Sequence, residues 1–284
     1  MEAFFETVYA FMGLVLPFDW IAHDFMKRAF IAILFMAPAA AAVGIHVVNF
    51  RMSFFSDAIS HSAFTGVAIG IVAGIDPVYT LVLFGLLVGG LIVKMRKRSD
   101  LSVDAIIGVA FSTSVALGIV IISAKRGLTR NLHSFIYGDL LAVTEGELAL
   151  MAMLSMVVLL FSVFLYNRLI LIAVSEEVSR TKGINTALYE YAFSILLALV
   201  VCLSIRVVGI LLVTAMIIIP ATIGRTLSKS VGSLFWITTV TAIVSSLSGL
   251  ISSYYWDTST GATVVLASAF LFFAAQIVKG MRGY

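Results

Sequence analysis

Long apolar runs separated by short polar segments dominate this 284-residue chain. A helix needs roughly 20 mostly apolar residues to cross the hydrocarbon core of a bilayer, since each residue adds only about 1.5 Å. Runs near that length fall at 29–49, 54–74, 77–93, 104–123, 148–166, 187–205, 207–222, 234–253 and 261–278. The pattern therefore predicts an all-α, polytopic transmembrane helical bundle of about nine spans (eight or nine).

The run 207–222 is short, and Arg206 alone separates it from the run before it. Two structures fit this spacing: a tight turn between two spans, or a break within one longer helix pair.

Composition strengthens the membrane interpretation. Hydrophobic residues make up 61% of the chain and charged residues 12%, against about 25% charged in soluble domains, which excludes a water-soluble monomer. Cys202 is the only cysteine, so the chain has no internal disulfide and no thiolate zinc cluster. The formal net charge is +3, and basic residues gather near the ends of the runs, which indicates orientation signals and not nucleic-acid binding.

The basic residues predict how the chain is oriented. The densest cluster lies at 94–98 and is expected on the cytoplasmic side. Counting outward from it places the N-terminus outside and the C-terminus inside, with Asp76 and Asp257 outside. Two basic groups, at 27–28 and 125–130, are exceptions to this arrangement.

Three segments do not fit a simple span. Residues 1–27 form an N-terminal extension that carries Glu2 and Glu6 where a signal peptide needs basic residues, so we expect an interfacial helix. The connection 124–147 contains a short apolar element, 134–142, expected to be re-entrant or interfacial. The most polar segment, 175–186, predicts a short cytoplasmic helix that starts at Ser175 and stops at Gly183.

Asp57 and His61 are the candidate metal ligands. They lie four residues apart within an apolar run, which places them on one face of a helix. Ionisable groups at membrane depth are costly to desolvate, and they mark functional sites by default. A carboxylate and an imidazole suit a first-row divalent cation, although such a pair can also simply satisfy itself. Two ligands are too few for a closed four-ligand site, and weak, partly hydrated coordination suits a transported ion.

Gly66, Gly70 and Gly74 repeat every four residues on the same predicted helix. This spacing lets two helix backbones approach closely in lipid. Gly66 and Gly70 fall on the opposite side of the helix from Asp57 and His61, and Gly85 and Gly89 on the next run are a candidate partner surface for them.

Other polar or special residues are weaker candidates. His46 is more typical of a packed or interfacial residue than of a ligand. His133 and Asp139 lie in the outer connection, where entry of the ion, contact with a partner or turn formation all fit. Glu190 is expected at the membrane interface, and Asp257 in a turn or docking loop. The remaining positions are expected to kink a helix (Pro38, Pro220) or to pack in the interior (Met36, Met52, Met216).

Four ordered blocks resemble a known family: RMSFFSDAISHS (51–62), IYGDLLAV (136–143), VGILLVTAMIIIPATIGR (208–225) and YWDTSTGATVVL (255–266). They are similar to permease subunits of the zinc/manganese/iron ABC importer family, and the resemblance covers roughly residues 28–280.

The resemblance implies an importer with the vitamin-B12-permease-like architecture in a bacterial plasma membrane. Residues 28–284 would be the permease domain, and 175–186 the coupling helix that docks on the ATPase. The expected partners are two ATPase subunits, an extracytoplasmic metal-binding protein and a second copy of the permease, whose own Asp/His pair would face that of the first. The chain has no Gly-x-x-x-x-Gly-Lys-[Ser/Thr] loop, so ATP is expected only in a partner. We expect no permanently bound cofactor and no enzymatic activity. Zinc, manganese and iron all fit the ligands.

Two other functions fit the site pattern less well. An ion-coupled secondary transporter or channel would use Asp57 and His61 as a proton relay. An intramembrane metalloenzyme is disfavoured, because the sequence lacks His-Glu-x-x-His and a clear third ligand.

Overall fold

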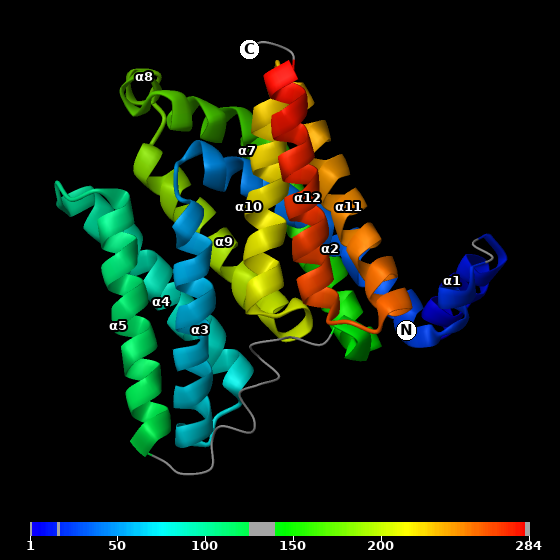
Figure 1. Cartoon of the computed structure of the whole chain (residues 1–284). Coiled ribbons are helices and arrows are strands. Elements are labelled where there is room, and N and C mark those ends of the chain that lie inside the picture. The colour runs from blue at the N-terminus through cyan, green and yellow to red at the C-terminus, as the bar shows by residue number, and fades with distance from the viewer. Residues whose placement is uncertain (1, 16–17, 125–139, 282–284) are drawn as a thin grey trace. The chain divides into compact units, whose positions relative to one another are not determined.

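The computed structural model describes residues 2–15, 18–124 and 140–281, and all regular structure within these ranges is helical (Figure 1). The helices are α1 (Glu2–Val15), η1 (Asp19–Ala22), α2 (Asp24–Asn49), α3 (Ser53–Ala73), α4 (Pro77–Arg98), α5 (Val103–Ala124), η3 (Leu140–Ala142), α7 (Glu145–Val174), α8 (Glu176–Thr181), α9 (Thr186–Val208), α10 (Ile210–Leu227), α11 (Val231–Trp256) and α12 (Thr260–Met281).

Eight of the described helices are long and apolar enough to cross a membrane: α2, α3, α4, α5, α7, α9, α11 and α12. The all-helical, polytopic prediction is therefore confirmed. The ninth predicted run forms α10, whose apolar part, Leu212–Leu227, is shorter than the others. Sixteen residues rise about 24 Å, less than the roughly 30 Å of a hydrocarbon core.

A helix break separates α9 from α10. Gly209 has a φ of 82° and its N–H donates to the carbonyl of Ile205 at 2.8 Å. Because a side chain is strained at this φ, glycine is the residue that fits there. Of the two structures that fitted the spacing, the chain adopts the tight turn, in which Gly209 alone connects the two helices (Figure 1). The prolines at 38 and 220 lie inside α2 and α10, and both helices continue through them.

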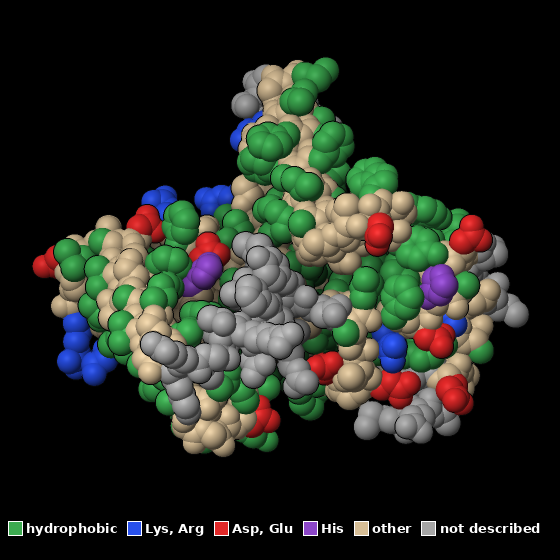
Figure 2. Space-filling model, turned by 60° about the horizontal axis from the view of Figure 1, so that its bottom comes forward, with side chains coloured by type: hydrophobic (Ala, Val, Ile, Leu, Met, Phe, Trp, Pro, Cys, Tyr) green, Lys and Arg blue, Asp and Glu red, His purple; other side chains and the backbone are tan. Residues whose placement is uncertain are grey.

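Large apolar side chains remain exposed along the long helices. Examples are Leu83 on α4, Phe164 on α7 and Phe270 on α12, each at least 60% exposed. Apolar side chains also cover much of the face in Figure 2. A water-soluble protein rarely exposes so much apolar surface, whereas lipid tails would cover it.

The chain divides into two compact units. One comprises Met1–Ile45, Asp139–Leu160 and Ala215–Tyr284, and contains the packed pair α11 and α12. The other comprises His46–Gly138 and Phe161–Thr214, and is built on α3, which packs against α4 and α5 on different sides and also touches α9 (Figure 1). The candidate metal site lies within the second unit.

The turn into α3 is tight. Only residues 50–52 separate α2 from α3, and the N–H groups of Phe50 and Met52 donate to the carbonyls of His46 and Val47 at 2.8 and 2.9 Å. Arg51 adopts a left-handed φ of 56°, a conformation that is uncommon for a residue with a side chain. The hydrogen bonds fix how α3 leaves α2, and with it the direction in which each face of α3 points.

The predicted glycine face of α3 packs against α4. A Cβ atom on Gly66 would lie 2.7 Å from the Cα of Leu81, and one on Gly70 would lie 2.9 Å from the Cα of Pro77. Close backbone packing at these two positions is therefore confirmed. The prediction is wrong for Gly74, which ends α3 in a left-handed conformation with open space around it.

The predicted partner glycines of α4 have a different role. A Cβ atom on Gly85 would lie too close to the thiol of Cys202 on α9, whereas one on Gly89 would make only ordinary van der Waals contacts. Gly85 therefore helps α9 to approach α4, while the partner of Gly66 and Gly70 is the first turn of α4.

Candidate metal site

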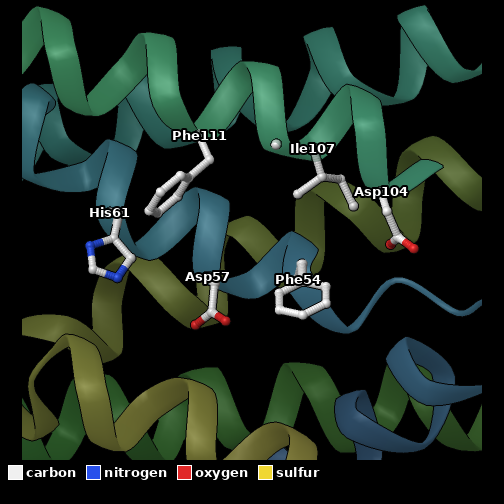
Figure 3. Close-up of a pocket in the computed structure, with 7 residues that line it drawn as sticks. Phe54, Asp57, His61, Asp104, Ile107 and Phe111 are labelled. Atoms are coloured by element: carbon white, nitrogen blue, oxygen red, sulfur yellow. The ribbon is translucent and has the colours of Figure 1, made fainter. Parts of the chain in front are cut away.

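The His61 side chain lies beside Phe111 of α5, whereas the Asp57 carboxylate points away from the α5 ribbon (Figure 3). They line a pocket of about 350 Å³ together with Phe54 of α3 and four residues of α5 (Figure 3). The α5 residues are Asp104, Ile107, Gly108 and Phe111. Both Asp57 and His61 are half-buried, so each can be reached from the pocket while being partly shielded from solvent.

Contacts from other helices orient the two candidate ligands. The Thr214 hydroxyl, on α10, donates a hydrogen bond to the Asp57 carboxylate, and His61 attracts this carboxylate electrostatically. The imidazole of His61 meets the ring of Phe111 edge-on, with centroids 5.1 Å apart. Thr214 is itself buried. Three helices thus hold the Asp/His pair in place, which a metal-contacting group requires.

The pair can supply two ligands to one cation. Side chains four residues apart on a helix have Cβ atoms about 5–6 Å apart, so a carboxylate oxygen and an imidazole nitrogen can reach the same ion at about 2 Å each. The described residues contain no group of three His, Cys, Asp or Glu side chains placed to hold a metal. Within the described residues, the pair therefore supplies two ligands of a four-ligand shell.

The other predicted candidates lie elsewhere. His46 is 1% exposed and packs edge-on against Tyr166 and Phe193, in agreement with a packed residue. Asp257 ends α11 in a left-handed conformation, which is turn formation. The methionines at 36, 52 and 216 are buried, as predicted. His133 and Asp139 lie outside the described residues.

Glu190, near the start of α9, is buried and ion-paired. Its side chain is 7% exposed, and its Oε2 and Oε1 atoms lie 3.2 Å from Nζ of Lys97 and 3.9 Å from Nη2 of Arg96. Arg96 Nη1 also lies 3.5 Å from the sulfur of Met52, the N-cap of α3. A buried ion pair thus joins the polar ends of α4 and α9 next to the helix that carries Asp57.

Helix α8 forms where the sequence predicts it. Ser175 caps its N-terminus and accepts a hydrogen bond from the N–H of Val178 at 3.3 Å. Glu176 accepts hydrogen bonds from Arg180 at 2.6 Å and from Thr186 at 3.0 Å. Partial burial opposes ionisation of Glu176, but the hydrogen bonds outweigh it and hold its pKa below the ordinary value. The Thr186 contact ties α8 to the start of α9.

Sequence reasoning missed Asp104, which lines the pocket, and Thr214, which donates a hydrogen bond to Asp57. Thr214 lies within the block 208–225, but nothing in its spacing connects it with Asp57, 157 positions earlier. Asp104 begins a predicted span, where an acidic residue is ordinary helix-start chemistry. Only the packing of α10 and α5 beside α3 brings these residues to the site.

Comparisons with known proteins agree with this architecture. The family model described as "ABC 3 transport family" matches residues 22–279. The high-affinity zinc uptake system membrane protein ZnuB of Haemophilus influenzae is 32% identical over 82% of this chain and 89% of its own. The manganese import system permease protein ScaB of Streptococcus gordonii is 30% identical over 92% of this chain and 95% of its own. The solved structure of PsaBC from Streptococcus pneumoniae in complex with Fab contains a chain with 27% identity and a TM-score of 0.77, over 89% of this chain and 91% of that one.

Proposed function

Because the chain belongs to the ABC 3 transport family, we propose that it carries a divalent transition metal through the membrane past Asp57 and His61. It is the permease subunit of an ATP-binding-cassette importer and a multi-pass membrane protein, and ATP hydrolysis belongs to a partner subunit. The main support for the metal path is the half-buried Asp/His pair, which lines a pocket between two membrane helices, α3 and α5.

The transported ion is zinc or manganese, with iron as a further candidate. The two relatives are named for zinc and for manganese. One carboxylate and one imidazole accept any of these three divalent metals. A soft copper(I) site would need thiolate or thioether ligands, which do not line the pocket.

The permease works as a pair of chains with two ATPase subunits and an extracytoplasmic metal-binding protein, in a bacterial plasma membrane. A second copy completes the ligand shell, because two Asp/His pairs supply four ligands. Helix α8 is the coupling helix, and its hydrogen bond to Thr186 passes a movement of the ATPase to α9. With α10 as a ninth crossing, the N-terminus is outside and the C-terminus inside. Residues 1–27 are an extension whose helix α1 lies at the membrane interface.

Metal uptake by the reconstituted importer tests the site. Asp57→Ala and His61→Ala should each abolish ATP-dependent uptake of zinc or manganese into proteoliposomes, while the complex still assembles. His23→Ala, an exposed histidine outside the pocket, should transport normally. Full uptake by both pocket variants would refute the metal path.

The same vesicles separate the importer from an ion-coupled carrier. The permease alone should take up no metal, with or without a proton gradient, because it lacks the ATPase. Uptake by the lone chain that follows the gradient would favour the carrier.

Charge reversal at Glu176 and Glu177 tests α8. The doubly reversed variant should assemble but show less transport-linked ATP hydrolysis than the wild type. Unchanged coupling would remove the coupling role of α8.

A further inference from the structure

The space between α3 and α5 is closed at one end and open at the other. Near the closed end, the Thr65 hydroxyl donates to the carbonyl of Ser114 at 2.6 Å, and a Cβ atom on Gly118 would lie 3.3 Å from the Cα of Thr65. At Gly108, two to three turns earlier on α5, an added Cβ atom would meet nothing within 4 Å. The pocket that holds Asp57 and His61 therefore widens toward the N-terminal ends of the two helices.

The two helices are parallel and in register along this pocket. His61 lies opposite Phe111, and Thr65 lies opposite Ser114. Going back one to two turns on each helix brings Asp104 to the level of Phe54, and both line the pocket (Figure 3). Asp104, Gly108 and Phe111 are spaced four and three residues apart, so they share one face of α5.

Asp104 lies too far along α5 to bind the same ion as His61. Seven residues separate it from Phe111, which is about 10 Å of helix rise, whereas a metal ligand lies about 2 Å from its ion. This agrees with the absence of a three-ligand cluster among the described residues. Asp104 can therefore contact a cation only before or after Asp57 and His61 do.

The charges of the neighbouring segments indicate which side of the membrane the open end of the pocket faces. The open end of the pocket lies at the N-terminal ends of α3 and α5, which follow Arg51 and the basic cluster 94–98 in the chain. Such basic segments mark the cytoplasmic side. An acidic residue in the first turn of a helix also interacts favourably with the helix dipole, which alone would explain an aspartate at 104. The dipole does not explain why the same side chain lines the Asp57 pocket beside the open space at Gly108.

We propose that Asp104 is the next cation contact on the transport path, taking the divalent metal from Asp57 and His61 toward the cytoplasm. This inference rests on the proposed function. Asp104 is exposed, so it holds a hydrated ion weakly and releases it readily, as a conducting path requires. Because Gly108 has no side chain, a partly hydrated ion has room to pass between the Asp57/His61 pair and Asp104.

The test is metal uptake by proteoliposomes that contain the permease, ATPase and binding protein. Asp104→Asn should lower the initial rate of zinc or manganese uptake at saturating metal by about tenfold, the size expected for one lost charged contact. Equilibrium binding of the same metal by the permease–ATPase complex should not change, since Asp57 and His61 remain. Asp104→Glu should restore most of the rate, and Asp100→Asn, in the exposed loop just before α5, should leave it unchanged.

A second pair of variants tests the space without removing a charge. Gly108→Val should slow uptake because it fills the path. Gly90→Val on α4 is the matched control, since an added Cβ atom is also free there and Gly90 does not line the pocket.

The outcomes separate this inference from the proposed function. If Asp57→Ala abolishes uptake while Asp104→Asn and Gly108→Val match the wild type, Asp104 is not on the path, but the importer and its site stand. An equal loss in Asp104→Asn and Asp100→Asn would reveal a general effect of surface charge and would also overturn the role of Asp104. If Asp57→Ala transports normally, the proposed function itself fails. Should Asp104→Asn not assemble, the Gly108→Val and Gly90→Val pair decides.

Discussion

Glu190→Gln should destabilise the permease more than any exposed charge change. The carboxylate is 7% exposed and lies 3.2 Å from the Lys97 ammonium and 3.9 Å from the Arg96 guanidinium. At an effective dielectric constant of about 20, Coulomb attraction at these distances is of the order of 4–5 kcal/mol for each cation. Desolvation offsets much of it, and removing one partner of a buried pair costs about 3–5 kcal/mol. Since the cations are 23–25% exposed, we expect a loss of about 3 kcal/mol.

The loss can be measured by titrating the detergent-solubilised permease with sodium dodecyl sulfate and following its helicity by circular dichroism. A double-mutant cycle with Lys97→Met isolates the ion pair from other effects of each change. Glu177→Gln on the exposed face of α8 is the control. The reasoning is refuted if Glu190→Gln unfolds at the same detergent concentration as Glu177→Gln, or if the coupling energy between Glu190 and Lys97 is close to zero.

Three further predictions concern packing, the site and α8. Gly66→Val should destabilise the unit by about 2 kcal/mol or more in the same titration, because its Cβ atom would meet the backbone of Leu81 at 2.7 Å; Gly90→Val, in open space, should not. Thr214→Val should lower metal uptake about tenfold by removing the hydrogen bond to Asp57, and Thr214→Ser should retain uptake. The lowered pKa of Glu176 stabilises α8 at neutral pH, so Glu176→Gln should speed amide hydrogen exchange in α8 at pH 7; the difference from the wild type should vanish as the pH falls through that pKa.

The spans and the half-site could be predicted from the sequence because their signals are local. An apolar run long enough to cross a bilayer has few alternatives to a helix, and the four-residue spacing of Asp57 and His61 fixes their common face. The start of α8 at Ser175 and its end near Gly183 follow from capping chemistry in the same way.

The remaining features depend on contacts between distant segments. The ion pair of Glu190 could not be predicted because its cations lie on α4, 93 and 94 positions earlier. Gly74 continued the four-residue glycine spacing, yet α3 ends there. The spacing alone cannot distinguish a glycine that packs against another helix from one that ends its helix in a left-handed conformation. Thr214 reaches Asp57, and Asp104 reaches the pocket, only through contacts between helices that are distant in the sequence.

The tight turn at residues 50–52 makes the length of this segment as important as its composition. One residue inserted at the start of α3 would shift the register of the helix by one position, about 100° around its axis. Either α3 would turn its Asp/His face away from α5, or the backbone hydrogen bonds that close the turn would break. Substitutions of the exposed Arg51 need only tolerate its left-handed conformation. Variants with an insertion or deletion in this turn should therefore lose metal uptake. A library of single-residue insertions across the α2–α3 junction would test this, because the variants with insertions at residues 50–52 should be inactive.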